Sequence, residues 1–248
     1  MTSPISDKWR AAVCCFLGLW VPLMSYGADL FYMDHDILSG QYTGPVGSLV
    51  MSGDIEPGDY DRLLAKIAEN PPRFIERNTL IVASEGGDAN EAMKIAGLIK
   101  ALHTQILVGP LTGRCADVCF LIYVVADQRG TDGSGLIGIR GTPQSQTSSV
   151  GDFLRANEVS AEFLTRVLKP PSDGVYWLED NDETHLGTRS PAFMRYLVAH
   201  CHWDDQMERD VRSAKRPLAD MNDMWACRRR VTQSDAAATL KERSSTHR

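Results

Sequence analysis

Short apolar runs alternate with amphipathic helical segments through the middle of this 248-residue chain. A continuous apolar run such as Thr79 to Ser84 is typical of a strand that is buried on both faces of a parallel sheet. Between such runs, apolar residues recur every three or four positions, as they do on the buried face of a helix. The expected strands lie at 47–53, 79–84, 105–108 and 136–139, and the expected helices at 60–69, 92–102, 118–126 and 151–168. This alternation predicts an α/β fold in which right-handed crossovers build a mostly parallel sheet flanked by helices.

The N-terminal residues have the pattern of a secretory signal. Two basic residues precede an apolar run from Ala11 to Met24, and small residues follow before Ala28. The run holds about 14 residues and is interrupted by Pro22, whereas a helix that spans a membrane needs about 20. We therefore expect a periplasmic or secreted protein that has no stable membrane span once the signal is cleaved. An uncleaved anchor is the alternative.

Length and composition allow one sizeable domain with additional segments at both ends. We expect a signal peptide at 1–27, an N-terminal extension at 28–46, the α/β domain at 47–190, a helical C-terminal segment at 191–231 and a disordered tail at 232–248. The tail is rich in Ser, Thr, Ala and charge, which favours disorder. The net charge of −6 disfavours nucleic acid as a partner. The basic cluster Arg228-Arg229-Arg230 is interpreted as a solvated face, and we expect no cofactor.

Export would place four cysteines in a compartment that permits disulfides. Cys201 and Cys227 flank a polar segment, and we expect a disulfide between them. Cys115 and Cys119 are four residues apart, which on a regular helix separates their Cβ atoms by about 5–6 Å. A disulfide needs roughly 3.5–4.5 Å. This second pair would therefore form a bridge only at an irregular first turn, and a disulfide and two packed thiols both remain open.

A cluster of possible metal ligands follows at His200-Cys201-His202, with Asp204 and Asp205 close behind. Adjacent residues point to different faces on either a helix or a strand. We therefore interpret the histidines as surface residues near a disulfide, and expect no metal.

The turn after the third expected strand reads Gly113-Arg114-Cys115-Ala116-Asp117-Val118-Cys119. Taken in order with Ser84-Glu85-Gly86-Gly87-Asp88 and Ile137-Gly138-Ile139, this turn resembles the Clp protease proteolytic subunits, in particular their periplasmic relatives, of the ClpP/crotonase superfamily. The resemblance covers roughly Leu49 to Thr188, where the stretch from Trp177 looks like the family's closing helix and final strand. It implies a spiral of repeated β-β-α and βαβ units, a homo-oligomer, and a peptide or protein as ligand.

The resemblance also implies a serine nucleophile in this turn, a histidine base two residues after a strand glycine, and an acid before the closing helix. These positions fall on Asp117, Arg140 and Asp173. No histidine lies between His103 and His185 in the sequence, and arginine stays protonated in proteins, so Arg140 cannot accept a proton from a hydroxyl. Without a histidine to orient, Asp173 would be a turn residue. We therefore expect a catalytically inactive peptidase homologue that acts as a binding or assembly module.

Gly86 and Gly87 match the glycines whose amides, with that of Val118, would form the family's oxyanion hole. A tight turn between a strand and a helix also needs glycine. We expect Asp117 and Arg140 to form a partly buried ion pair, because an unpaired carboxylate is costly to bury and a guanidinium fits it well. The pair requires their charged groups to lie within about 4 Å.

Two kinds of residual hydrolase remain as alternatives. In one, Asp117 acts as a nucleophile or base beside the oxyanion hole, as acids do in some crotonase-fold enzymes. In the other, Ser84 or Ser134 replaces the missing serine. Neither serine has a histidine at a position that the resemblance identifies.

Overall fold

A five-stranded sheet lies at the centre of the computed structural model, which describes residues 27–33, 47–109, 113–131, 136–140, 147–167 and 174–246. The strands lie side by side in chain order: β1 (Asp29–Tyr32), β2 (Leu49–Ser52), β3 (Thr79–Ala83), β4 (Gln105–Val108) and β5 (Gln128–Thr131). β1 pairs with β2 in the antiparallel direction, and the other neighbours are parallel. The prediction of an α/β fold with a mostly parallel sheet is confirmed.

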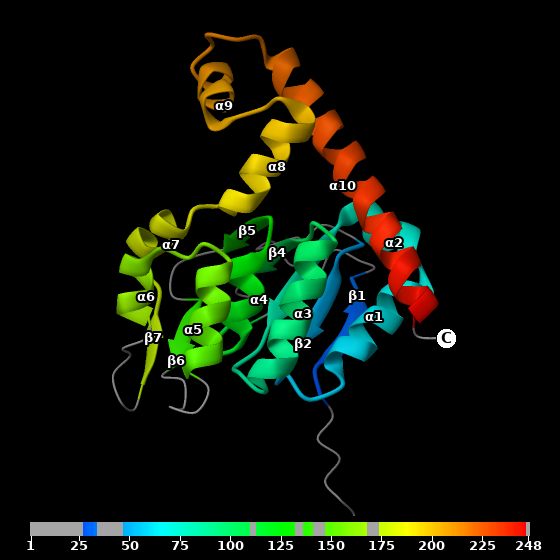
Figure 1. Ribbon diagram of the computed structural model, residues 1–248, viewed down its shortest axis with the longest axis vertical. Coiled ribbons are helices and arrows are strands. Elements are labelled where there is room, and N and C mark those ends of the chain that lie inside the picture. The colour runs from blue at the N-terminus through cyan, green and yellow to red at the C-terminus, as the bar shows by residue number, and fades with distance from the viewer. Residues whose placement is uncertain are drawn as a thin grey trace, which may run out of the picture.

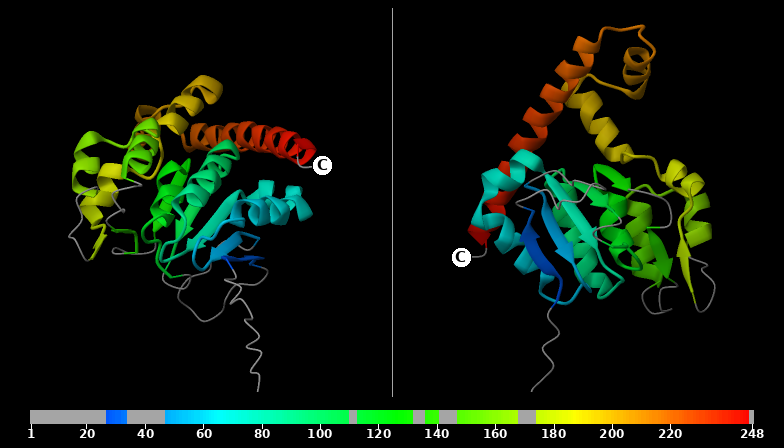
Figure 2. Two further views of the ribbon diagram at one scale, coloured as in Figure 1. Left: turned by 60° about the horizontal axis from the view of Figure 1, so that its bottom comes forward. Right: turned by 180° about the vertical axis from the view of Figure 1, so that it is seen from behind.

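Helices cover one face of this sheet (Figure 1). The domain helices are α1 (Asp59–Glu69), α2 (Pro71–Arg77), α3 (Ala89–Ala101), α4 (Cys119–Val125), α5 (Thr147–Ala156), α6 (Ala161–Val167) and α7 (Asp180–Leu186). Side chains alternate along each strand, so Leu80 and Val82 belong to the main core under the helices, whereas Ile81 faces the other way with Val50. The view from behind shows that face without a covering helix among the described elements (Figure 2).

Two short strands extend the fold beside the main sheet. β6 (Gly138–Arg140) pairs with β7 (Val175–Trp177) in the antiparallel direction. The expected closing helix is α7, and the expected final strand is reduced to a single antiparallel bridge between Gln128 and Arg189.

Three further helices form a C-terminal arm that projects from the sheet and returns to it (Figure 1). They are α8 (Pro191–Cys201), α9 (Asp205–Arg212) and α10 (Leu218–Thr246). The arm leaves the domain next to Arg129, which is 5% exposed and donates only to backbone carbonyls. These acceptors are Val124, Leu186, Gly187 and Arg189, which lie at or just beyond the C-terminal ends of α4 and α7. A cation is favourable there because carbonyl groups at helix C-termini carry partial negative charge.

The predicted disordered tail is wrong, because residues 232–246 belong to α10. Thr232, Ala236 and Leu240 recur every four residues and are buried. Thr239 Oγ1 donates to the carbonyl of Ala101 at 3.3 Å, which attaches the helix to the end of α3. Composition alone missed this helix because the segment is polar on average. Its few apolar residues form a narrow stripe on one face of the helix, and the other faces are polar.

Two other local predictions need correction. The expected helix at 151–168 is divided into α5 and α6, because Glu158 adopts a left-handed conformation with φ of 62° and Ser160 Oγ caps α6 by accepting from Phe163 N at 3.2 Å. The Pro71-Pro72 pair ends α1 as expected but also begins α2, where proline costs no helical hydrogen bond.

The expected disulfide between Cys201 and Cys227 is formed, with Cα atoms 5.9 Å apart. It joins the end of α8 to α10 and closes a hairpin that contains α9. Inside the hairpin a small separate core is built from Trp203, Val211, Met221 and Met224. The disulfide adds a covalent link to this small core and limits how far the hairpin can open.

Replacing both cysteines, as C201S with C227S, should lower the free energy of unfolding by about 3 kcal/mol, because the bridge removes the closure entropy of a loop whose ends are 26 residues apart. Urea denaturation of the oxidised protein and of the double variant measures the difference. As the control, both chains are compared under reducing conditions, where neither has this bridge and their stabilities should agree. A loss below about 1 kcal/mol would show that the hairpin is held by packing instead.

Candidate functional site

Backbone hydrogen bonds hold residues 114–117 between the end of β3 and β6. The bonds run from Ser84 N to Arg114 O (2.8 Å), from Ala116 N to Ser84 O (2.8 Å), from Asp117 N to Gly138 O (2.9 Å) and from Gly138 N to Cys115 O (2.9 Å). The turn that carries Asp117 is therefore held on both sides as if it were a short strand, and its position does not depend on side chains.

Asp117 itself has φ of 52°, in the left-handed region. Aspartate tolerates this conformation better than most residues that carry a Cβ atom. The disulfide between Cys115 and Cys119 spans the turn, with Cα atoms 5.2 Å apart. It forms because Cys115 lies in a strand-like bridge before the helix and only Cys119 is helical, which is the irregular first turn that a bridge at this spacing requires.

Gly86 and Gly87 bring the preceding loop close to the turn, with φ of 147° and 131°. A Cβ atom on Gly87 would lie 2.1 Å from the carbonyl oxygen of Ile55, and one on Gly86 would lie 3.0 Å from Asp117 Oδ2. The Asp117 carboxyl group therefore lies against the backbone at Gly86. Close approach to backbone requires glycine at position 87, and the positive φ favours glycine at both positions.

Two of the three amides expected in an oxyanion hole have no acceptor within the described residues. The amides of Gly87 and Val118 donate no hydrogen bond there, whereas that of Gly86 donates to Ser84 Oγ at 3.3 Å. Two N–H groups in the segments that meet at the turn thus remain available to an acceptor. The oxyanion hole itself stays a prediction.

The Asp117 carboxyl group is half-buried, and burial raises its pKa above the usual range of aspartate, while the positive charge of Arg140 opposes this shift. Within the described residues, however, Asp117 forms no ion pair within 4.0 Å and no side-chain hydrogen bond. The predicted ion pair between Asp117 and Arg140 is therefore wrong. Arg140 lies exposed at the end of β6, where a hydrated guanidinium gains little from pairing.

Ser84, one of the two alternative nucleophiles, already uses its hydroxyl group in a hydrogen bond. Ser84 is 3% exposed, and its hydroxyl donates to the carbonyl of Gly86 at 3.0 Å. His103 precedes β4, so it lies at the opposite end of the parallel sheet from Ser84, which follows β3. Ser134 and Asp173 lie outside the described residues.

The His200-Cys201-His202 cluster is not assembled as a ligand set. The Cys201 sulfur is in the disulfide, and the His200 ring stacks on Tyr196 and interacts through Nδ1 with the Tyr196 carbonyl at 2.9 Å. No group of three metal-binding side chains occurs in the ranges that the structure describes.

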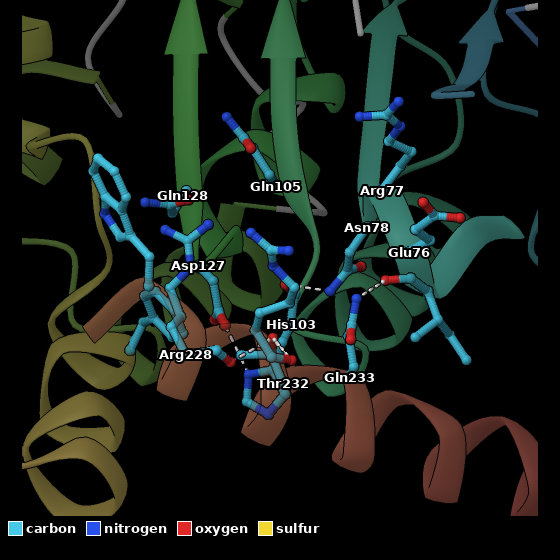
Figure 3. A pocket seen from close by; sticks show the side chains of 14 residues that line it. Glu76, Arg77, Asn78, His103, Gln105, Asp127, Gln128, Arg228, Thr232 and Gln233 are labelled. Atoms are coloured by element: carbon cyan, nitrogen blue, oxygen red, sulfur yellow. Dashed lines mark hydrogen bonds and ion pairs between the residues drawn. The ribbon is translucent and has the colours of Figure 1, made fainter. Parts of the chain in front are cut away.

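A polar cavity, which the sequence did not predict, lies where β3, β4 and β5 begin (Figure 3). There His103 Nδ1 lies 2.7 Å from Asp127 Oδ2, beside side chains from α2 and α10. The only sequence signal was the cluster Arg228-Arg229-Arg230, which we interpreted as a solvated face. Arg228 in fact lines this cavity and is partly buried.

Solved structures with a similar fold include ClpP-type proteases. ClpP1 from Listeria monocytogenes has a TM-score of 0.43 and 13% identity, over 58% of this chain and 88% of that one. A variant of the same protein has a TM-score of 0.40 and 17% identity, over 57% and 88% of the two chains. A serine-to-alanine variant of the 1510-N membrane-bound stomatin-specific protease has a TM-score of 0.37 and 13% identity, over 56% and 77%. These likenesses concern the fold alone. No protein-family model and no curated protein matches the chain.

Gly87→Ala should lower the free energy of unfolding by more than about 2 kcal/mol, because the new Cβ atom would collide with the Ile55 backbone at a positive φ. The control is Gly97→Ala in α3, where a Cβ atom meets nothing within 4 Å. There alanine should stabilise the helix by up to about 1 kcal/mol. Chemical denaturation of both variants checks the pair, and equal stabilities would contradict the close approach.

Proposed function

We propose that this chain is an exported ClpP-like protein that has no serine-peptidase activity and serves as a binding or assembly module. The observation that carries the proposal is the missing hydroxyl–imidazole pair: the nucleophile turn presents the carboxyl group of Asp117, and the base position is Arg140. A serine becomes a nucleophile only when a base within hydrogen-bond reach accepts its proton. Arginine does not accept one.

The rest of the turn supports a binding role. Its backbone ladder, its disulfide and the two unbonded amides are all kept although the nucleophile is absent. Amides that lack an acceptor are suited to hold a carbonyl or carboxylate oxygen of a peptide, which is how such turns bind substrates before any chemistry occurs. Assembly into a homo-oligomer belongs to the same proposal, on the strength of the family resemblance.

Export is supported by the two disulfides, since such bonds persist in oxidising compartments. Among the residues described, no helix combines the length and the apolar composition that a membrane crossing requires. The expected signal peptide lies outside the described residues, apart from Gly27.

Labelling with a fluorophosphonate, which reacts with activated serines, tests the absence of peptidase chemistry. We expect no label on the unchanged chain, and none on Asp117→Ser, because Arg140 still offers no base. A known serine hydrolase labelled in parallel serves as the positive comparison. Stoichiometric labelling of the unchanged chain would refute the proposal and point to another serine.

A second candidate function is hydrolysis that uses Asp117 as nucleophile or base. It is favoured by one observation: the carboxyl group has neither an ion pair nor a side-chain hydrogen bond in the described structure, and lies near two unbonded amides. A carboxyl group held in this way is free to attack an acyl carbon or to accept a proton.

If this candidate is correct, the chain should hydrolyse p-nitrophenyl acetate, and Asp117→Asn should lower kcat/KM at least about a hundredfold, the usual contribution of a positioned base. Only the ionised carboxylate acts. Because burial raises its pKa, activity should fall on acidification at a higher pH than an ordinary aspartate would give. Asp223→Asn, an exposed change on α10, is the control. Turnover that is equal in the unchanged chain and D117N excludes this role.

A further inference from the structure

The cavity where β3–β5 begin has the size of a small-molecule site and is separate from the Asp117 turn. Its volume is about 360 Å³, within the range of about 300–1,000 Å³ that is usual for ligand pockets. Its walls come from the end of α2, the starts of β4 and β5, and α10, which closes it from one side (Figure 3). The Asp117 turn follows the opposite, C-terminal end of β3.

Three arginines that line this cavity form no ion pair with a described residue. Arg228 is partly buried, yet its guanidinium has no ion pair and no hydrogen bond to a described residue. Burial, and then the neighbouring charges of Arg189 and Arg229, lower its pKa, while the more weakly acting charges of Asp127 and Glu208 oppose this shift. Arg229 and Arg77 also line the cavity without an ion pair in the described part of the chain. A desolvated cation normally has a partner, and no described residue supplies an ion pair to Arg228.

The two carboxylates in the wall do not fill this role. Asp127 is buried and interacts with His103 at 2.7 Å, so one of its oxygens is already engaged by a ring whose pKa this carboxylate raises, against the effect of burial. Its charge does act favourably on Arg228, but from beyond ion-pair distance. Glu76 is exposed to solvent. The cavity therefore keeps an excess of positive charge near Arg228.

Neutral hydrogen-bond donors lie on the strand side of the same space. Gln105 and Gln128 begin β4 and β5 and are direct neighbours in the parallel register. Their side-chain amides make no hydrogen bond with any described residue, although both line the cavity. By contrast, Gln233 Nε2 donates to the carbonyl of Ile75 at 3.3 Å, so this residue attaches α10 to α2 rather than offering a donor.

An aromatic ring completes the lining. Trp225 on α10 is 47% exposed, which is high for so large an apolar side chain. It lines both this cavity and a shallower hollow along α10, together with Arg229. An exposed indole next to a guanidinium is suited to contact a planar or apolar group.

We propose that this cavity binds a small anionic molecule, whose carboxylate or phosphate group is held by the guanidinium of Arg228 and the side-chain amides of Gln105 and Gln128. Charge-assisted hydrogen bonds from a planar guanidinium match both kinds of oxyanion. Trp225 and Arg229 contact the remainder of the molecule. Because the donors come from the sheet and from α10, a bound anion joins the C-terminal arm to the domain and stabilises the folded state increasingly as its concentration rises above the dissociation constant.

The test is a titration of the full chain with inorganic phosphate and, separately, with succinate, at constant ionic strength maintained with chloride. Isothermal calorimetry measures affinity, and thermal unfolding measures stabilisation. We expect saturable binding of at least one of the two anions, and which of them binds identifies the source of the oxyanion. Arg228→Gln should weaken binding by about tenfold or more, the effect of losing a charged hydrogen-bond donor.

Lys241→Gln is the matched control, because it removes the same charge from an exposed position of α10 that does not line the cavity. It should leave affinity unchanged. Gln128→Ala removes a donor on the strand side without altering α10, and it should also weaken binding. If R228Q fails to fold, Q128A therefore still tests the proposal. Absence of saturable binding of either anion, or equal affinity in the unchanged chain, R228Q and Q128A, overturns it.

Discussion

The backbone ladder that joins the end of β3, the Asp117 turn and β6 determines the geometry of the candidate site. Residues 114–117 exchange hydrogen bonds with Ser84 on one side and with Gly138 on the other. The Gly87 loop then approaches the Ile55 backbone so closely that no side chain fits. Main-chain groups supply these contacts, and the positive φ of Asp117 is the main demand on the residue at this position. The placement of position 117 is thus a property of the fold, while its chemistry depends on one side chain.

The Asp117 turn combines a backbone-defined frame with one carboxyl group. The ladder and the disulfide between Cys115 and Cys119 hold this frame. The same frame leaves the Asp117 carboxyl group half-buried and without an ion pair, since Arg140 is directed to solvent at the end of a short strand. Asp117 and Arg140 carry opposite charges, but they interact without an ion pair within 4.0 Å. They therefore do not form the structural contact that we expected.

The two ends of the sheet carry different chemical groups. At the C-terminal end of β3, neutral amides and a carboxyl group surround the turn. At the start of the same sheet, cations and side-chain amides surround a cavity that α10 closes. The arm that brings α10 there is fixed by the disulfide between Cys201 and Cys227 and by the carbonyl contacts of Arg129. The anion site that we propose thus depends on the arm, whereas the Asp117 turn does not.

Much of the fold followed from the sequence, because the spacing of apolar residues is a local property. The runs at 79–84 and 105–108 predicted buried parallel strands, and the glycines at 86 and 87 predicted the tight loop beside the turn. The proposal of a candidate site at Asp117, where the family resemblance places a serine, also came from residue order, and it stays a prediction. Only the tertiary structure decided the contacts between segments. The separation of Asp117 from Arg140 depends on where β6 ends, and the docking of α10 depends on an apolar stripe that composition does not reveal. The sequence showed the charge of Arg228 but not its partial burial. Burial depends on how distant segments pack around a residue, and not on the residues next to it in the sequence.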